Sequence, residues 1–514
     1  MVKQLPDIQE DDHSDISPEY LEALLPEIRA ELLEKHTQHL RREQAEQQRF
    51  RASGGLEALF QQWHEIHIRW VSSKPYTASA PFTSRLSPGL HVFFTPLEGK
   101  LTEPLCNLLK QAFGPDQKCK DTNETFIKLP IQPGSERFSM SASSEYYSYV
   151  TGLSYFIGFV GKKLCPQTSV ACKGLAHSLW SASSLDIDYD TISHAIVLTA
   201  YWPDAPMGGS WTETITTPTA DSIVEIGVLV HEPVPDPEDI GFSGFLTVLG
   251  QDTSPAATRF QTPTRHYPLP SSSALTYRAS FSHPTGLHPT LLLTLSRPPV
   301  PPNPTCKLHT HLTLPSPLFL DKHAFHDPLA LSSHHLSALH SLSGATDLEA
   351  PDWVTPEWGS AALFEIALPQ SSSPSPSGEW NTSIPLHLRY LPASTASHAR
   401  VAIPWPVVFW ACRADEGAKM ASSPFDRVHL GYEGLFGVKT RFMHVEPKHG
   451  DGDGNRWMVE WIEVPVLDLR GAGWVERGTV GVVVLAFLGL CWALFGRVGA
   501  VGKGKGKAGE KKKQ

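Results

Sequence analysis

The chain has 514 residues, more than one hydrophobic core usually accommodates, so a single small domain is excluded. Hydrophobic residues make up 41% and charged residues only 19%, and the 44 prolines and 38 glycines favour short strands and turns over long helices. The net charge of −10 argues against a nucleic-acid partner, because phosphate binding requires a basic face. We therefore expect a mostly β protein with more than one module.

Residues 1–55 are expected to be an acidic, partly disordered extension that contains one short helix. Ser17-Pro18 is a typical helix start, and leucines and an isoleucine recur at helical spacing over 21–32. The first 50 residues contain no apolar segment behind a basic start, so no cleavable signal peptide is predicted. Translocation across a membrane would then rely on another segment, or on an N-terminus that this sequence lacks.

Two β-sandwich-like modules are expected after this extension, because short apolar or alternating runs recur between turn clusters. The first module is expected over 56–250 and the second over 305–477, with the Ser/Thr/Pro-rich stretch 251–304 as a linker or domain edge. Strand candidates in the first module are 66–71, 91–94, 126–129, 145–150, 192–201, 210–216, 223–231 and 245–249. Those in the second module are 308–314, 384–391, 402–410 and 458–465, with loops at 326–362 and 370–378.

The segment 478–496 is an uncharged apolar run between Arg477 and Arg497, close to the ~20 residues that a helix needs to cross the hydrocarbon of a bilayer. The tail 497–514 carries a net charge of +6, which leaves −16 on the preceding part of the chain. By the positive-inside rule, the tail is cytoplasmic and the acidic bulk lies across the membrane. A buried core helix and a removed lipid-anchor signal are the alternatives, and the Lys-rich tail argues against the second.

Several features agree with the endoplasmic reticulum as the compartment. Lys511 and Lys512 resemble a dilysine retrieval signal, although a random Lys-rich tail gives the same match. Asn123 and Asn381 begin acceptor triplets for N-glycosylation, whereas the triplet at Asn303 is blocked by its proline. These features place the bulk of the chain in the lumen, provided that the topology is right.

Six cysteines remain when Cys491 in the apolar segment is set aside. Six cysteines allow 15 pairings, so the sequence alone does not decide among them. Proximity along the chain favours three disulfides, which an oxidising lumen would permit. The favoured pairs are Cys106 with Cys119, Cys165 with Cys172, and Cys306 with Cys412.

Three sets of residues could carry metal chemistry. Asp186 and Asp188 have the spacing of a metal-binding Asp-x-Asp pair, but we expect a solvated strand edge because the run continues into an apolar strand. Among seven histidines, His309 and His311 could bind zinc from alternate strand positions, although no third ligand is fixed by spacing. The seven are His309, His311, His323, His326, His334, His335 and His340.

The run 451–455 resembles the start of a calcium loop, but its later ligand positions do not match, so a turn is preferred. A Gly-x-Ser-x-Gly nucleophile elbow is absent from the sequence. We therefore predict no catalytic residues, no cofactor and no bound metal.

The second module carries a recognisable series of segments. PTCKLHTHLTLPSPLFLDK at 304–322, PLHLRYLP at 385–392 and IPWPVVFWAC at 403–412 precede the apolar segment. This series resembles the PIG-X family, which includes the fungal protease-B-nonderepressible protein. The stretch from IHIRW at 66–70 to about residue 250 resembles the additional N-terminal half of fungal members, while 1–55 has no counterpart there.

The resemblance implies a single-pass protein of the endoplasmic-reticulum membrane, with its bulk luminal and its C-terminus cytoplasmic. It implies a noncatalytic subunit that stabilises PIG-M, the multi-span catalytic subunit of the mannosyltransferase that adds the first mannose to the glycosylphosphatidylinositol precursor. The alternative is a more general luminal folding factor for membrane proteins. A luminal metal-dependent enzyme that uses Asp186, Asp188 or the histidines is a third and weaker hypothesis.

Overall fold

The computed structural model describes most of the chain from residue 63 to residue 501. The described ranges are 63–80, 82, 84–97, 104–129, 144–166, 169–190, 195–203, 223–231, 242–249, 256–262, 264–283, 285–347, 350–369, 378–413, 431–437, 439–448 and 457–501. Contacts divide the chain into Met1–Trp63 and His64–Gln514, and the fold below is that of the second unit. The helix expected within 1–55 lies outside the described residues.

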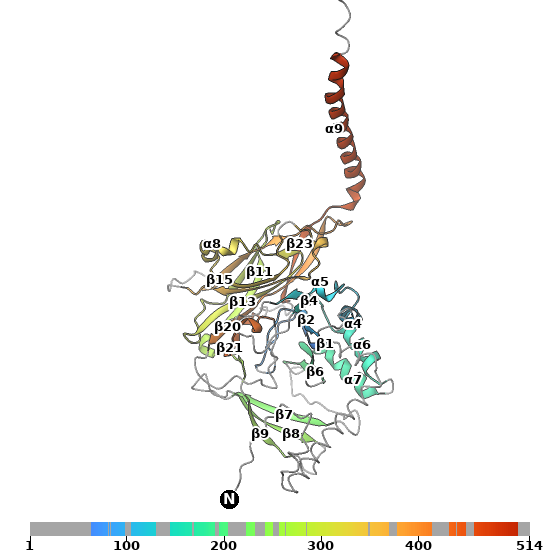
Figure 1. Cartoon of the computed structure of the whole chain (residues 1–514). Helices are drawn as coiled ribbons and strands as arrows, with labels where there is room; N and C mark the ends of the chain where they lie inside the picture. The colour runs from blue at the N-terminus through green and yellow to red at the C-terminus, as the bar shows by residue number, and fades with distance from the viewer. Residues whose placement is uncertain are drawn as a thin grey trace, which may run out of the picture. The chain divides into compact units, whose positions relative to one another are not determined.

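The first sheet has six strands in the order β3-β4-β2-β1-β5-β6 (Figure 1). They are β1 (Trp63–Val71), β2 (Gly89–Pro96), β3 (Ile127–Lys128), β4 (Ser144–Ser148), β5 (Ser184–Asp190) and β6 (Ile196–Tyr201). Short helices occupy the connections: α4 (Pro104–Phe113), α5 (Thr122–Thr125), α6 (Ser154–Phe159), the π-helical turn Val160–Leu164, α7 (Val170–Ser178) and the 3-10 turn Leu179–Ser181. A separate three-stranded sheet contains β7 (Val224–His231), β8 (Phe242–Leu249) and β9 (Thr258–Thr262).

A second six-stranded sheet has the order β10-β21-β20-β13-β16-β15. Its strands are β10 (His266–Tyr267), β13 (Cys306–Pro315), β15 (Leu336–Gly344), β16 (Gly359–Ile366), β20 (Val407–Arg413) and β21 (Thr440–His444). A four-stranded sheet in the order β17-β12-β11-β22 contains β11 (Thr276–Phe281), β12 (Thr290–Leu295), β17 (Trp380–Pro385) and β22 (Glu446–Pro447). Two short strand pairs complete the set: β14 (Leu318–Phe319) with β18 (His387–Leu388), and β19 (His398–Pro404) with β23 (Val459–Pro465).

The remaining elements are short helices and the C-terminal helix. The short ones are α8 (Pro328–Ser333) and the 3-10 turns Ser271–Ser273, Ala324–His326, Asp352–Val354, Glu433–Leu435 and Leu469–Gly471. At the start of α8 the Asp327 carboxylate accepts a hydrogen bond from the Leu329 amide, and Pro328 occupies the first turn, so capping fixes this helix. Because most of the elements are strands, the expectation of a mostly β fold is confirmed.

Residues 276–295 correct the expectation of a linker at 251–304. β11 and β12 lie in this range, and β12 pairs with β17 along its whole length, from Thr290 opposite Pro385 to Leu295 opposite Trp380. The sequence around them is rich in serine and proline, but β12 itself reads TLLLTL and buries its alternate leucines. The stretch is thus part of a sheet with strands from the expected second module.

One hydrophobic core contains residues from both expected modules. Val71, Tyr76 and Phe93 come from the first, and they belong to the same buried cluster as Leu293 and Leu308. Two backbone contacts support this continuity, because the Met458 amide donates to the Ser73 carbonyl at 2.7 Å and the Trp358 amide donates to the Thr125 carbonyl at 3.0 Å. The two expected modules are therefore joined through buried side chains of one cluster and through backbone hydrogen bonds.

Two local expectations in the second module are wrong. The range 326–362, expected as a loop, contains β15 and the start of β16. The range 402–410, expected as one strand, is split between β19 and β20, and β20 has a hydrogen-bonded neighbour on each side. Pro404 and Pro406 flank the break, because proline supplies no N–H to continue a ladder.

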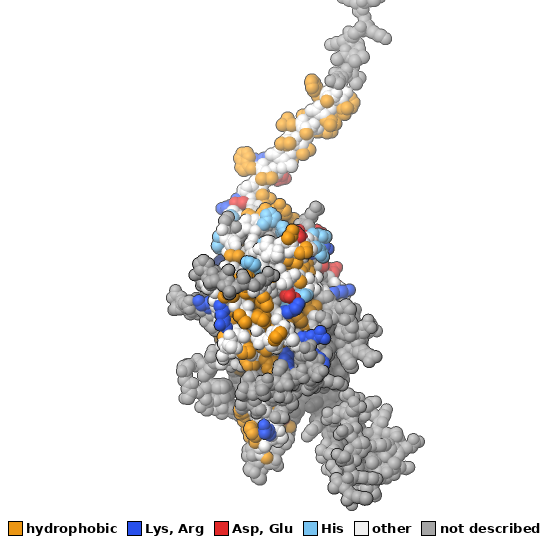
Figure 2. All heavy atoms as spheres, turned by 90° about the vertical axis from the view of Figure 1, so that its left-hand side faces the viewer, with side chains coloured by type: hydrophobic (Ala, Val, Ile, Leu, Met, Phe, Trp, Pro, Cys, Tyr) orange, Lys and Arg blue, Asp and Glu red, His pale blue; other side chains and the backbone are white. Residues whose placement is uncertain are grey.

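Helix α9 (Ala472–Val501) contains the expected apolar segment. The candidate membrane span Leu469–Phe495 includes the preceding 3-10 turn and most of this helix; its mean hydropathy is 2.3, and none of it is buried within the protein. Figure 2 shows hydrophobic side chains along this helix. A core helix would be buried, so the alternative of a buried core helix is excluded for this part of the chain.

Candidate functional site

Asp186 and Asp188 lie in the middle of the first sheet and not at a solvated edge. In the antiparallel β1–β5 pair, Asp186 is directly opposite Arg69 and Asp188 is opposite His67. Asp186 is only 4% exposed and Arg69 is fully buried. The expectation of a solvated edge was wrong, because the charges that compensate the aspartates come from a strand more than 100 residues earlier.

These four residues, the Asp186 cluster, are connected by short contacts between their side chains. Arg69 donates from Nε to Oδ1 of Asp186 at 2.5 Å and from its terminal nitrogen to Oδ2 at 2.9 Å. His67 places Nε2 3.0 Å from Oδ1 of Asp186 and Nδ1 2.5 Å from Oδ1 of Asp188. Arg69 also donates to the backbone and side-chain oxygens of Ser84, at 3.1 and 2.9 Å. The cluster thus joins two strands and a loop.

In the Asp186 cluster, neighbouring opposite charges outweigh the effect of burial on the pKa values of His67 and Asp186. Burial alone lowers the pKa of His67, but the carboxylates of Asp188 and Asp186 outweigh it and raise that pKa to about 9. Burial alone raises the pKa of Asp186, but Arg69 and His67 hold it well below its usual range. Both carboxylate oxygens of Asp186 are already bonded to Arg69 or His67, so Asp186 connects strands β1 and β5. This arrangement gives no support to the hypothesis of a metal-dependent enzyme that uses Asp186 and Asp188.

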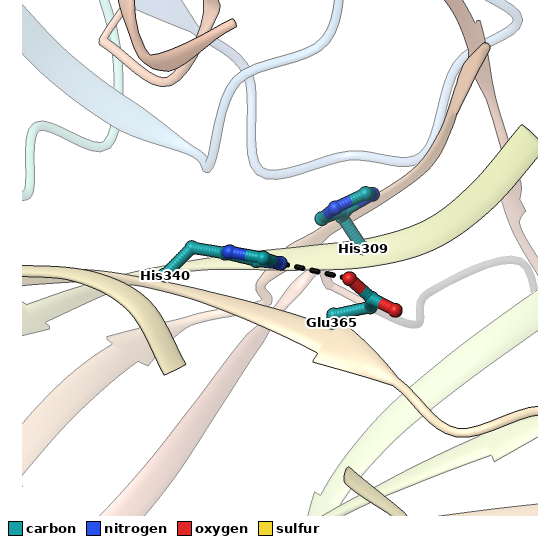
Figure 3. A group of neighbouring side chains, drawn as sticks. All are labelled: His309, His340 and Glu365. Atoms are coloured by element: carbon teal, nitrogen blue, oxygen red, sulfur yellow. Dashed lines mark hydrogen bonds and ion pairs between the residues drawn. The ribbon is translucent and has the colours of Figure 1, made fainter. Parts of the chain in front are cut away.

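A second polar cluster, the His309 cluster, consists of His309, His340 and Glu365 from three adjacent strands of the second sheet (Figure 3). One nitrogen or oxygen atom from each residue lies within 4.8 Å of the others. His340 Nε2 is 2.9 Å from Oε2 of Glu365, and Lys307 Nζ is 3.1 Å from the same oxygen. Of the seven histidines singled out in the sequence, the structure brings only His309 and His340 into this group.

Glu365 was missed by the sequence reasoning. It is the single acid in the otherwise apolar β16 segment GSAALFEI, and it lies directly opposite His309 in the β13–β16 register. An acid in a strand of this kind is the one signal that could have drawn attention to it. The pairing of β13 with β16 was not predictable, since 326–362 was expected to be a loop.

The other histidines have separate surroundings. His311 is buried near the Tyr432 ring, and burial lowers its pKa to about 3. His334 lies 2.8 Å from the Ser383 hydroxyl, and His335 lies 2.8 Å from the Asn381 carbonyl oxygen. The remaining two, His323 and His326, have ring centroids 6.3 Å apart beside the 3-10 turn Ala324–His326.

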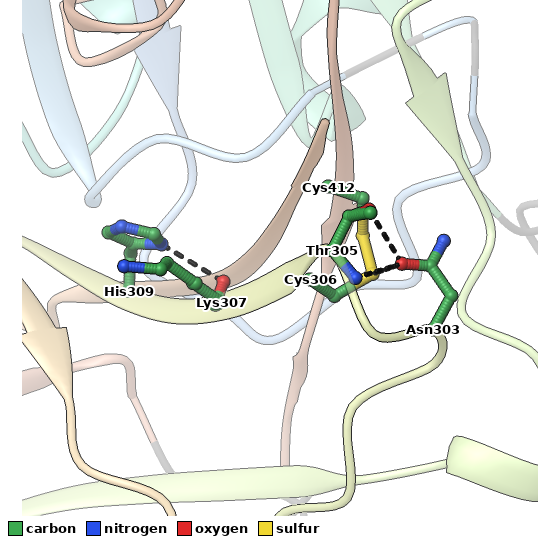
Figure 4. The surroundings of a disulfide bond; sticks show 6 residues. All are labelled: Asn303, Thr305, Cys306, Lys307, His309 and Cys412. Carbon is green, nitrogen blue, oxygen red and sulfur yellow. Dashed lines mark hydrogen bonds between the residues drawn. A yellow bond between two sulfur atoms is a disulfide. The ribbon is translucent and has the colours of Figure 1, made fainter. Parts of the chain in front are cut away.

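The three disulfides follow the pairing that proximity along the chain favours. Cys106 is bonded to Cys119, Cys165 to Cys172 and Cys306 to Cys412. The last of these ties β13 to β20, where the two cysteines are directly opposite, three residues before His309 (Figure 4). This end of β13 is therefore fixed covalently.

The structure describes the two predicted glycosylation sites but not the predicted retrieval signal. Asn123 lies on α5 and Asn381 on the edge strand β17, and both are exposed, as a glycan would require. Lys511, Lys512 and the run 451–455 lie outside the described residues.

A pocket of about 570 Å³ lies where segments of the two expected modules meet. The loop 77–80 and Arg85 line one part, and the segment 267–269, His444 and Glu446 line another. Arg85 is 3.7 Å from the Glu446 carboxylate. Beside the pocket, the Tyr432 hydroxyl donates to the Arg85 carbonyl oxygen at 2.8 Å. The wall at Arg85 is thus supported by a buried hydrogen bond, and among the described lining residues no nucleophile is paired with a base.

Comparison with known proteins assigns the family. A family model described as PIG-X / PBN1 matches residues 284–495, a range that includes the His309 cluster, the Cys306–Cys412 disulfide and the candidate span. Protein pbn1 of Emericella nidulans is 43% identical over 457 residues, covering 85% of each chain. This chain belongs to the PIG-X/PBN1 family. Protein pbn1 of Aspergillus oryzae is 42% identical, and the alignment covers 89% of each chain. Protein pbn1 of Aspergillus fumigatus is 44% identical, and the alignment covers 84% of this chain and 82% of the relative.

The relatives extend the PIG-X/PBN1 assignment beyond the range that the family match covers. That range begins at residue 284, between β11 and β12, whereas the alignments cover more than four fifths of the chain. They therefore include much of the first sheet in addition to the second. This agrees with the buried cluster that contains Val71 and Phe93 of the first sheet together with residues of the second.

Proposed function

We propose that this protein is a noncatalytic, stabilising subunit of the mannosyltransferase complex that adds the first mannose to the glycosylphosphatidylinositol precursor. Membership of the PIG-X/PBN1 family carries the proposal. The proposed partner is PIG-M, the multi-span catalytic subunit of that complex. No nucleic acid and no cofactor take part.

The membrane anchor supports an accessory role. Transfer from a polyprenyl-phosphate sugar to a lipid acceptor requires a protein cavity at membrane depth, which several spans must enclose. The described part of the chain supplies one candidate span, Leu469–Phe495. In that helix a Cβ added at Gly481 or Gly489 would meet open space, so small residues are available for close approach of a partner helix.

The proposed location is the endoplasmic-reticulum membrane, with the bulk of the chain in the lumen and the C-terminus in the cytoplasm. The charge of +6 on the tail supports this orientation through the positive-inside rule. Three disulfides support an oxidising compartment for the β-rich part. Exposure of Asn123 and Asn381 is compatible with glycosylation on that side.

Affinity purification of the tagged full-length protein from mild detergent tests the proposal. We expect one multi-span glycosyltransferase to be recovered in stoichiometric amount. Recovery of many substoichiometric membrane proteins would support the general folding factor instead. A version in which 478–496 is replaced by an unrelated apolar span separates contacts made by the luminal part from contacts made by the helix.

A further inference from the structure

We propose that His309, His340 and Glu365 form a binding site for a zinc-like divalent cation on the β13–β16–β15 part of the second sheet. This inference is independent of the proposed function, because it rests only on the geometry of the His309 cluster. Spacing along the sequence fixes no third ligand for the histidines, whereas the order of the strands brings Glu365 beside them.

The strand register places two of the ligands on one face. His309 on β13 is directly opposite Glu365 on β16, and directly opposite residues of an antiparallel pair have Cβ atoms about 5 Å apart. Thr310 and Leu308 point to the other side, where Leu308 lies in the hydrophobic core. A side chain from the next strand can therefore complete a site beside this pair.

His340 supplies that side chain because β15 is bulged at this residue. Leu339 pairs with Phe364 and Ser341 pairs with Leu363, so His340 is the additional residue of β15 at this point. A bulge changes the direction of the side chain it contains. The His340 ring then lies 2.9 Å from the Glu365 carboxylate, with its centroid 5.4 Å from that of His309 (Figure 3).

The ring of His309 is oriented for ligation. Its Nδ1 is 3.0 Å from the Lys307 carbonyl oxygen, a bond in which Nδ1 carries the proton and donates (Figure 4). Nε2 then keeps a free lone pair, the arrangement that fixes the tautomer of metal-ligating histidines. His309 is 3% exposed and is held by ring contacts with Phe409 and Phe436, at centroid distances of 5.7 and 5.1 Å.

The donor set and its spacing suit zinc. Two histidines and a glutamate, with water at the fourth position, form a known zinc-binding set with bonds of about 2.0–2.2 Å. Tetrahedral ligands at that length lie about 3.4 Å apart, so atoms now within 4.8 Å need to move by about 1 Å. His340 can make this movement, since its side chain is 41% exposed.

An ion can reach the site from solvent. A pocket of about 280 Å³ is lined by His340 together with Lys322, His326 and Thr346. Of the three proposed ligands, His340 is the one that lines this pocket, so solvent has access to the site at His340. Lys307 lies at the same carboxylate, with Nζ 3.1 Å from Oε2 of Glu365, and a bound ion would displace this ammonium group. The site would connect the outermost strand, β15, to β13.

Zinc binding to the purified full-length protein in detergent tests the proposal. The probe is Zn²⁺ alone in equilibrium dialysis, with bound metal counted per chain, and Co²⁺ provides a spectroscopic signature of tetrahedral coordination. We expect one ion per wild-type chain. His340→Ala and Glu365→Gln should each weaken binding by at least about tenfold, because ligands matter at least as much as the outer-shell residues that orient them.

Two control variants keep the test decisive. His398→Ala removes an exposed histidine from β19 and should leave binding unchanged. Lys307→Ala removes the competing ammonium group and should bind zinc up to about fivefold more tightly, which an unfolded variant could not do. Absence of stoichiometric zinc from the wild type, or equal binding by the wild type and His340→Ala, would overturn the proposal.

Discussion

Arg69 and Asp186 face each other across the β1–β5 strand pair, although 117 residues separate them in the sequence, and two hydrogen bonds join them. A forked pair of this kind is stronger than a single-point contact. It lies at the centre of the first sheet, where neither residue is exposed to water. The pair therefore explains how a buried aspartate stays ionised.

Replacing one partner of this pair should strongly destabilise the fold. For Asp186→Asn we expect a loss of about 3 kcal/mol in the free energy of unfolding, because the buried Arg69 loses its counter-charge. The measurement is the unfolding of the purified full-length protein, followed by tryptophan fluorescence. Arg278→Met is the matched control, since its partner Glu379 is partly exposed and such pairs contribute roughly 0–1 kcal/mol. Equal losses in the two variants would contradict this account.

His67 should make stability depend on pH on the alkaline side. Its pKa is about 9 in the folded protein against an ordinary value of 6.5 for an unperturbed histidine, so its contribution is complete below pH 6.5 and is lost as the pH rises through 9. The size is at most about 3 kcal/mol, from the conversion of the pKa difference. We expect the stability difference between wild type and His67→Gln to shrink between pH 6.5 and 9. A difference that stays constant over this range would contradict the assignment.

The Cys306–Cys412 disulfide should contribute more to stability than Cys165–Cys172. The first closes a loop with a sequence separation of 106 and the second one of 7, and longer loops lose more chain entropy when closed. Replacing both cysteines of a pair with alanine should cost about 4–5 kcal/mol for the first and about 2 kcal/mol for the second. Unfolding midpoints of the two double variants compare them. A larger loss for the second pair would contradict the prediction.

Glycosidase treatment of the protein from cells should report its topology. We expect wild type to shift in mobility, and Asn123→Gln and Asn381→Gln each to lose one step of that shift. Asn303→Gln is the control, because Pro304 blocks that triplet, and its mobility should match wild type. A wild-type band that glycosidase does not move would count against the luminal placement.

The sequence predicted the strands better than their arrangement. Short apolar or alternating runs placed β1, β2, β13 and β23 within a few residues of their observed bounds, because such patterns are local properties of the sequence. Residues 276–295 were misassigned because the prolines and serines around them outweighed a short leucine-rich strand. The break at Trp405 was also missed, since two prolines are equally typical of a single strand at a sheet edge.

The candidate sites were also predicted only in part, because they depend on how the strands are arranged. Asp186 and Asp188 were recognised as a pair, but the positive partners Arg69 and His67 were not, because their proximity depends on β1 pairing with β5. Similarly, His309 and His340 were singled out, while Glu365 was not. Its place depends on the order of three strands and on a bulge, and neither can be obtained from the spacing of residues along the chain.

The lifetime of PIG-M in cells tests the central proposal most directly. After depletion of this protein, synthesis is stopped and the remaining PIG-M is followed over time, with its messenger RNA measured in parallel. The proposed stabilising role predicts a shorter lifetime for PIG-M and a loss of anchored surface proteins, with unchanged messenger RNA. An unchanged lifetime of PIG-M, with normal amounts of anchored surface proteins, would contradict it.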